Sequence, residues 1–165
     1  MKIRRAVEAD FEGMWPIFGA IVATGATYVF APDTPREEAF DYWFGPGVTS
    51  FVAEDEDRIV GMYKLVPNQR GLGSHVSNAS FMVDPASAGK GVGRSMGLHA
   101  LREARRAGYL AMQFNFVVST NAGAVELWKK LGFAIVGTLP RAFRHRELGH
   151  VDAYVMHRFL DDIEA

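Results

Sequence analysis

The chain has 165 residues, 48% of them hydrophobic, and a formal net charge of -1 at pH 7. This length predicts a single domain over residues 1–165, and the apolar fraction is enough to build an ordinary core. A near-neutral chain is unsuited to binding through phosphate neutralisation, so we expect no nucleic-acid partner. Cysteine is absent, which excludes disulfides, thiolate metal sites and a cysteine nucleophile.

The N-terminal segment shows no targeting signal. Charged residues begin at Lys2, and the apolar core of a signal peptide is missing. Residues 13–32 are uncharged and about as long as a membrane helix of roughly 20 residues. However, Pro16, Gly19 and Gly25 interrupt them, and the preceding flank is acidic rather than basic. We therefore expect a cytoplasmic protein without a membrane segment.

Hydrophobic periodicity predicts strands and helices along the whole chain. In chain order these are a strand at 2–7, helices at 9–24 and 34–45, strands at 50–53, 58–66 and 75–83, a helix ending near 107, a strand at 111–118, a helix at 122–131, and strands at 133–138 and 151–159. The second helix has a good start signal, with Thr34 as the cap and Pro35 at the first position. This order predicts an α/β (α+β) fold, a mixed sheet with helices on both faces.

The segment 81–97 carries the strongest functional signal. An apolar strand ends at Val83, and a turn with three glycines at alternate positions then opens a helix. The start of a helix offers unpaired N–H groups and a positive dipole end, which suit an anion. Glycines let a bulky anion approach the backbone, and Lys90 and Arg94 add positive charge. The turn therefore predicts a phosphate or pyrophosphate site.

Two common phosphate loops do not fit this turn. A nucleoside-triphosphate loop needs Ser or Thr after its Gly-Lys pair, whereas Gly91 follows Lys90 here. A dinucleotide fold places its glycines after the first strand, whereas these glycines come in mid-chain. A turn that serves only tight strand-to-helix packing stays open as an alternative.

Two motifs of this chain together resemble the GNAT superfamily of N-acetyltransferases. Residues 88–93 resemble the superfamily's Gln/Arg-x-x-Gly-x-Gly/Ala signature, which binds the pyrophosphate of coenzyme A. About thirty residues later, residues 121–124 followed by 127–133 resemble its Asn-x-x-Ala helix closed by Lys-x-Gly-Phe. The resemblance implies a central twisted sheet of about seven strands and acetyl-CoA as cosubstrate.

The chain departs from the superfamily pattern at two positions. Ala88 stands where Gln or Arg is usual, so one contact to the pyrophosphate is missing, with Lys90 and Arg94 as candidate substitutes. Trp128 stands where a tyrosine commonly serves as general acid to the leaving thiolate. The indole N–H donates a hydrogen bond but does not give up its proton in water, so the usual acid is absent.

A narrower resemblance points to the acceptor. Asn78 with Phe81, Asn115, and Asn121 resemble positions in the fungal enzymes that N-acetylate azetidine-2-carboxylate, a proline analogue. In that group, the asparagines that match Asn78 and Asn115 lie at the acceptor site, and the one that matches Asn121 contacts coenzyme A. An asparagine on a half-buried strand can also simply hydrogen-bond the backbone, and this reading of Asn115 stays open.

These resemblances imply three sets of site residues. The residues expected at the cofactor are Met82, Val83, Ala88, Gly89, Lys90, Gly91, Val92, Gly93, Arg94, Asn121 and Trp128. Those expected at the substrate are Tyr28, Phe30, Asn78, Phe81 and Asn115. The catalytic candidates are Asn78, Asn115 and Val83, whose backbone N–H would stabilise the carbonyl oxygen of the thioester. No metal site is expected.

The leading hypothesis is acetyl transfer from acetyl-CoA to the amine of a small molecule, by direct attack in a ternary complex. Acetylation of a protein N-terminus or lysine, and a non-catalytic acyl-CoA-binding module, remain alternatives. No carboxylate on strands 75–83 and 111–118 offers a general base. The histidines at 75, 145 and 150 read as ordinary surface residues, and the arginines at 141, 144 and 146 as a solvated face or an anion site. A homodimer is a further expectation.

Overall fold

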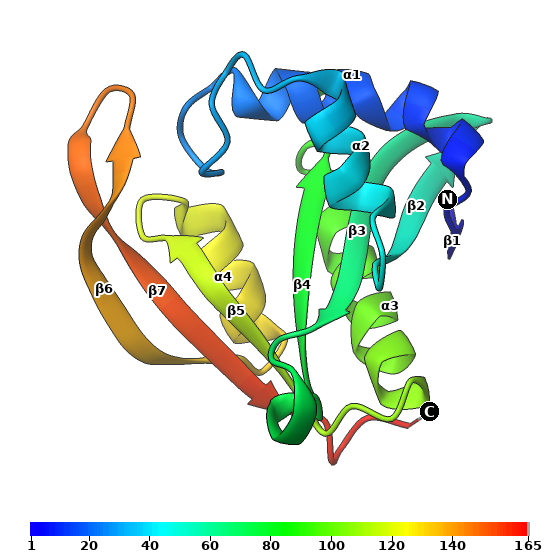
Figure 1. Ribbon diagram of the computed structural model, residues 1–165, viewed down its shortest axis with the longest axis vertical. Helices are drawn as coiled ribbons and strands as arrows, with labels where there is room; N and C mark the ends of the chain where they lie inside the picture. The colour runs from blue at the N-terminus through cyan, green and yellow to red at the C-terminus, as the bar shows by residue number, and fades with distance from the viewer. Residues whose placement is uncertain (165) are drawn as a thin grey trace.

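The computed structural model describes residues 1–164, which form one seven-stranded sheet flanked by helices (Figure 1). In chain order the elements are β1 (Lys2–Arg5), α1 (Phe11–Val22), α2 (Arg36–Phe44), β2 (Thr49–Asp55), β3 (Arg58–Pro67), β4 (Val76–Val83), α3 (Val92–Arg106), β5 (Ala111–Val118), α4 (Ala122–Lys130), β6 (Ala134–His145) and β7 (Gly149–Phe159). Short 3-10 turns precede α1 at Glu8–Asp10 and lie at Gly71–Gly73 and Pro85–Ser87. The mixed α/β fold expected from the sequence is confirmed.

The strand order is β1-β2-β3-β4-β5-β7-β6, and β4 and β5 form its parallel pair. These two strands pair only at their beginnings, where Val76 faces Ala111 and Ser77 faces Met112. Beyond this point they diverge, so that the sheet opens as a wedge between them (Figure 1). The remainder of β4 is paired on its other edge with β3, from Pro67↔Ser77 to Gly61↔Val83.

Each face of the sheet carries its own core. Val52, Met62 and Met82 lie in register on β2, β3 and β4 and pack against α1 and α2. On the other face, Phe51 and Tyr63 stack at 4.7 Å between ring centroids and belong to the core that α3 and α4 cover. This division follows from the two-residue period of a strand, which sends successive side chains to opposite faces.

Several element boundaries differ from the sequence-based expectation, and two of them have a clear local cause. The predicted cap Thr34 does not begin α2, because its hydroxyl donates to the Ala31 carbonyl oxygen and Pro35 takes the N-cap position. The strand predicted at 133–138 runs from Ala134 to His145, because a register shift between Leu139 and Phe143 lets the pairing with β7 continue. None of the helices in residues 1–164 is long and apolar enough to cross a membrane.

Candidate active site

The glycine turn lies between β4 and α3 and has the backbone geometry of an anion site. Gly89 and Gly91 adopt φ angles of 76° and 81°, a backbone conformation that residues with a Cβ rarely adopt. An added Cβ at either position would meet no heavy atom within 4 Å, so the backbone there is open to a ligand. Gly91 is the N-cap of the 15-residue helix α3, and Lys90 and Arg94 are exposed beside it. The free amides and these cations can together hold a diphosphate.

The edge of β4 that faces the wedge leads from this turn into the sheet. Asp84 donates its N–H to Val60 and Asn68 donates to Val76, so the even-numbered residues of β4 exchange hydrogen bonds with β3. Because hydrogen-bonding direction alternates along a strand, the N–H and C=O groups of Phe81 and Val83 point into the wedge. Two amide groups thus lie in sequence along a path from the glycine turn.

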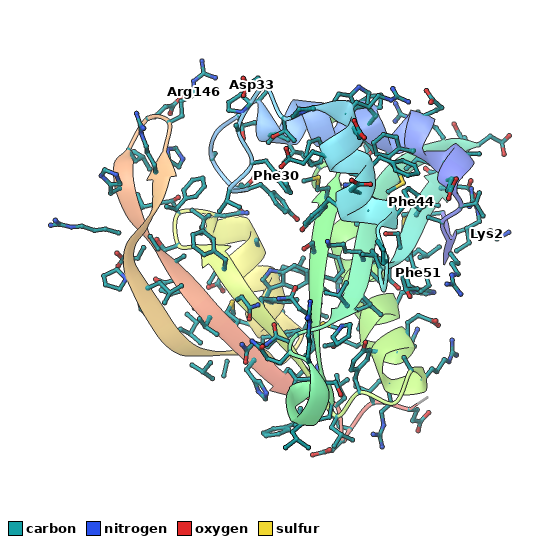
Figure 2. All side chains as sticks on the ribbon, in the orientation of Figure 1. Lys2, Phe30, Asp33, Phe44, Phe51 and Arg146 are labelled. Atoms are coloured by element: carbon teal, nitrogen blue, oxygen red, sulfur yellow. The ribbon has the colours of Figure 1, made fainter. Side chains whose placement is uncertain are left out.

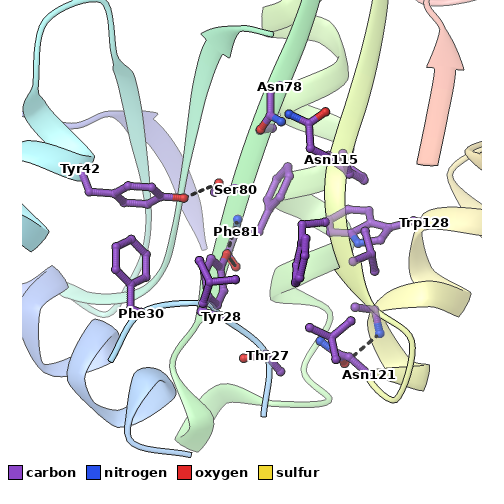
Figure 3. A pocket seen from close by; sticks show the side chains of 17 residues that line it. Thr27, Tyr28, Phe30, Tyr42, Asn78, Ser80, Phe81, Asn115, Asn121 and Trp128 are labelled. Carbon is purple, nitrogen blue, oxygen red and sulfur yellow. Dashed lines mark hydrogen bonds between the residues drawn. The ribbon is translucent and has the colours of Figure 1, made fainter. Parts of the chain in front are cut away.

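A cavity of about 300 Å3 lies at the inner end of this path. Its walls come from the loop after α1, from α2, β4, β5 and α4, and they hold all five predicted substrate residues (Figure 3). Among residues 1–164, the side chains that line it carry no formal charge. The predicted residues that meet there are Tyr28, Phe30, Asn78, Phe81, Asn115, Asn121 and Trp128.

An amide cluster closes one end of the cavity. The Oδ1 atom of Asn68 accepts from Nδ2 of Asn115 at 2.7 Å and from Nδ2 of Asn78 at 3.4 Å. Gln113 donates from Nε2 to Oδ1 of Asn115 at 2.8 Å. Asn68 therefore holds both predicted asparagines together at the narrow end of the wedge, next to the residues where β4 and β5 pair. Asn68 was not predicted, because nothing near it in the sequence indicates that it contacts β5.

Tyrosines form the opposite wall. The Tyr28 hydroxyl donates to the carbonyl oxygen of Phe81 at 2.6 Å and accepts from the Phe81 N–H at 3.1 Å. The Tyr42 hydroxyl donates to Oγ of Ser80 at 2.6 Å. Burial raises the pKa of both phenols above the usual value, so both remain protonated at neutral pH. Tyr42 was not predicted, since it lies within a helix that the sequence marks only by its start and end.

Trp128 and Asn121 contribute from α4. The Trp128 ring packs 4.8 Å from Phe81 and 4.7 Å from Phe114, centroid to centroid, and is 7% exposed. It fills the base of the wedge as an apolar surface. Asn121 is the N-cap of α4, and its Oδ1 accepts from the Ala124 N–H at 3.4 Å. This capping bond orients Asn121 at the cavity rim but leaves its amide nitrogen free to bind a ligand.

Met82 and the basic residues of the β6–β7 hairpin lie apart from this cavity. The Met82 side chain is 1% exposed in the core beneath α1 and α2, and its backbone faces β3, so we correct its expected place at the cofactor. Val83 lies outside the cavity lining, towards the glycine turn. Arg144, His145 and Arg146 line a second, adjoining cavity of about 640 Å3.

The β6–β7 hairpin is joined to the loop after α1. Arg146 donates its backbone N–H to the Gly25 carbonyl oxygen at 3.0 Å and its guanidinium to the Ala23 carbonyl oxygen at 3.1 Å. Figure 2 shows Arg146 at the hairpin tip, beside the loop that carries Phe30 and Asp33. These bonds join the hairpin to the start of the loop that carries Tyr28.

Comparison with known proteins identifies the family. The sequence pattern of the Acetyltransferase (GNAT) family matches residues 13–133, and the chain belongs to this family. It is similar to N-acetyltransferase aca1 of Schizosaccharomyces pombe, with 28% identity over 160 residues, 87% of this chain and 77% of that protein. The fold and the glycine turn thus belong to an acetyl-CoA-dependent N-acetyltransferase.

Solved structures agree with this assignment. A GCN5-related N-acetyltransferase from Kribbella flavida superposes with a TM-score of 0.91 and 42% identity over 96% of each chain. YncA from Salmonella typhimurium, solved with its cofactor acetyl-CoA, superposes with a TM-score of 0.86 and 25% identity, covering 100% of this chain and 96% of that one. The expected family, enzyme class and cosubstrate are confirmed.

Proposed function

We propose that this enzyme transfers the acetyl group of acetyl-CoA to the amine of a small molecule, an amino acid or a proline-like analogue, by direct attack in a ternary complex. The observation that carries this proposal is the uncharged cavity of about 300 Å3 at the inner end of the β4 edge. That volume is at the low end for ligand pockets, which favours a compact acceptor.

The glycine turn supports the coenzyme side of this proposal. The amides that follow Lys90, together with the Lys90 and Arg94 side chains, suit the diphosphate, and Ala88 adds no side-chain donor there. Val83 offers the next backbone N–H and C=O along the path, a match for the amides of pantetheine. The thioester would then enter the cavity beside Trp128 and Phe81.

The asparagines support the acceptor side. Asn78 and Asn115 each keep one amide hydrogen beyond those bonded to Asn68, and these hydrogens can hold the carboxylate of an amino acid. The Oδ1 of Asn78 can accept from the amine and orient its lone pair. Positioning both reactants in this way supplies much of the catalysis that acyl transfer needs.

A panel of amines tests this proposal. The rate of thiol release from acetyl-CoA is measured with small amino acids and cyclic imino acids, and in parallel with peptides that carry a free N-terminus or a lysine. We expect turnover on the small acceptors. Turnover on the peptides alone would support the alternative, a protein acetyltransferase, and would contradict a small-molecule acceptor.

Three further expectations remain proposals. These are a single domain over residues 1–165, a cytoplasmic location and a homodimer. The long β6 strand lies at the edge of the sheet and carries exposed Ile135, Val136 and Leu139, which is the kind of surface that pairs with a second copy. Sedimentation of the purified protein tests the dimer.

A further inference from the structure

One tyrosine occupies the backbone groups that the sheet leaves unpaired. The Tyr28 hydroxyl lies 3.1 Å from the N atom and 2.6 Å from the O atom of Phe81, and these groups point into the wedge where β5 has diverged (Figure 3). A single side chain oxygen thus takes the place of a neighbouring strand. Any ligand that accepts a hydrogen bond from the Phe81 N–H must therefore bind where the Tyr28 hydroxyl oxygen now lies.

The cavity indicates which backbone amide lies nearest the reaction. Phe81 lines the cavity together with Asn78 and Asn115, whereas Val83 lies nearer the glycine turn. A coenzyme that enters from the turn therefore passes Val83 before Phe81. Its reactive end would then reach the Phe81 N–H, and an acceptor held by the asparagines would lie beyond it.

We propose that the Tyr28 hydroxyl and the Phe81 N–H together bind the carbonyl oxygen of the acetyl thioester, as two donors of an oxyanion hole. This inference rests on the proposed function. In the free enzyme the hydroxyl accepts from the Phe81 N–H and donates to the Phe81 carbonyl oxygen. When the thioester binds, its oxygen takes over the N–H, and the hydroxyl turns its hydrogen towards that oxygen.

Acetyl transfer begins with attack of the acceptor amine on the thioester. The lone pair of the neutral amine forms a C–N bond with the carbonyl carbon, and the carbon–oxygen π pair moves to the oxygen. Tyr28 and Phe81 donate hydrogen bonds to this oxyanion without losing their protons. The pair then returns, the C–S bond breaks, and the sulfur leaves with that bond's electrons. The proton of the amine ends on the sulfur, directly or through water, which yields the amide and free coenzyme A.

The surroundings of Tyr28 suit a donor that keeps its proton. Its phenol is buried, and burial raises its pKa well above the usual value. Its ring packs 6.3 Å from Phe30, and the bonds from Arg146 to Ala23 and Gly25 hold the start of its loop. Tyr28 therefore donates a hydrogen bond from its wall of the cavity and does not replace the general acid that is absent at Trp128.

Tyr28→Phe tests this proposal, because it removes one oxygen atom and keeps the ring. We expect kcat to fall about 10²- to 10³-fold, the usual effect of deleting one oxyanion donor, with the Kd of acetyl-CoA within about threefold of wild type. Tyr63→Phe is the matched control. It also removes a buried hydroxyl, one bonded to Nδ1 of His99 at 2.6 Å outside the cavity, and should leave kcat within about threefold.

Other outcomes overturn the proposal in distinct ways. An unchanged or higher kcat with tighter acetyl-CoA binding would mean that the hydroxyl merely competes with the thioester. A parallel loss of coenzyme affinity and kcat would mean that Tyr28 only anchors its loop. Wild-type enzyme that releases no thiol with any amine would instead contradict the proposed function.

An infrared measurement covers the case in which the variant fails to fold. The carbonyl stretch of acetyl-CoA labelled with 13C at the carbonyl carbon is recorded free and bound to the wild-type enzyme. Two donors should lower its frequency on binding, and in folded Tyr28→Phe the shift should shrink. An unshifted band in the wild-type complex would contradict donation to this oxygen.

Discussion

The ammonium of Lys64 lies 3.2 Å from the ring centroid of Tyr42 and donates to the carbonyl oxygen of the same residue at 2.8 Å. Tyr42 is in the last turn of α2, where carbonyl groups lack helical partners and the helix dipole is negative. Lys64 therefore fastens this helix end to β3 and holds Tyr42 in the cavity wall. The lysine is 8% exposed, so this contact places a charge inside the protein.

This buried lysine predicts a pH dependence of stability. Burial lowers the pKa of Lys64 from 10.5 to about 8, so between these pH values the unfolded chain binds more protons than the folded one. The free energy of unfolding should therefore rise with pH in this window, by up to about 3 kcal/mol at 1.4 kcal/mol per pKa unit. Below pH 8 the lysine is charged in both states and contributes no slope.

Urea unfolding between pH 7 and 10 checks this prediction by comparison with Lys64→Met. The variant lacks the titrating group, so its free energy of unfolding should not rise with pH as the wild-type value does. The difference between the variant and the wild type should therefore favour the variant most at pH 7 and shrink towards pH 10. Lys2→Met, at the exposed start of β1, is the control and should follow the wild-type curve. Parallel curves for wild type and Lys64→Met would show that Lys64 keeps an ordinary pKa.

Gly91→Asp should remove the coenzyme site. The new carboxylate would repel the diphosphate at the amides that begin α3, and the φ of 81° would strain the turn. We expect the Kd of coenzyme A to rise at least about tenfold by calorimetry. Gly47→Asp is the matched control, since Gly47 has a φ of 78° and equally open surroundings away from the site. If both variants bound coenzyme A like wild type, the diphosphate would lie elsewhere.

The amide cluster predicts a separation of acceptor binding from coenzyme binding. Asn115→Ala removes a proposed acceptor contact and should raise the acceptor KM about tenfold, with the Kd of acetyl-CoA near wild type. Asn68→Ala should act in the same direction, because it leaves the amides of Asn78 and Asn115 without their shared acceptor. Asn68→Asp restores an acceptor oxygen and should recover most of the loss.

Steady-state kinetics with varied acceptor checks this set of variants. Gln69→Ala, at the residue next to Asn68, is the control and should keep the wild-type KM. An equal loss of acceptor and coenzyme affinity in Asn115→Ala would move Asn115 out of the acceptor site. An Asn68→Asp variant no better than Asn68→Ala would show that the cluster does not act through this oxygen.

Two glycines in helices predict opposite effects on stability. A Cβ at Gly97 of α3 would lie 2.5 Å from Cδ1 of Leu131 and 3.3 Å from Cζ3 of Trp128, so Gly97→Ala should lower the free energy of unfolding by about 1–3 kcal/mol. A Cβ at Gly19 of α1 meets nothing within 4 Å, so Gly19→Ala should raise it by up to about 1 kcal/mol. Thermal unfolding of both variants measures these changes. If Gly97→Ala and Gly19→Ala changed the free energy of unfolding in the same direction, the packing explanation would be wrong.

The sequence predicts the sheet and the glycine turn because both depend on local signals. Alternating apolar residues identify the strands, and Gly91 identifies the start of α3. The site depends on contacts between distant segments. The bond from Tyr28 to Phe81 spans 53 residues, and that from Asn115 to Asn68 spans 47, so no local pattern reveals them. The length of β6 escaped prediction for a related reason, since only its pairing with β7 carries the strand past Leu139.

A crystal structure of the enzyme with coenzyme A and a small amino acid would locate both ligands relative to the glycine turn and the cavity. We expect the diphosphate on the amides that follow Lys90, the thiol in the wedge beside Phe81, and the amino acid nitrogen between that thiol and the asparagines 78 and 115. A coenzyme bound away from the glycine turn, or an amino acid found only outside the cavity, would contradict this expectation.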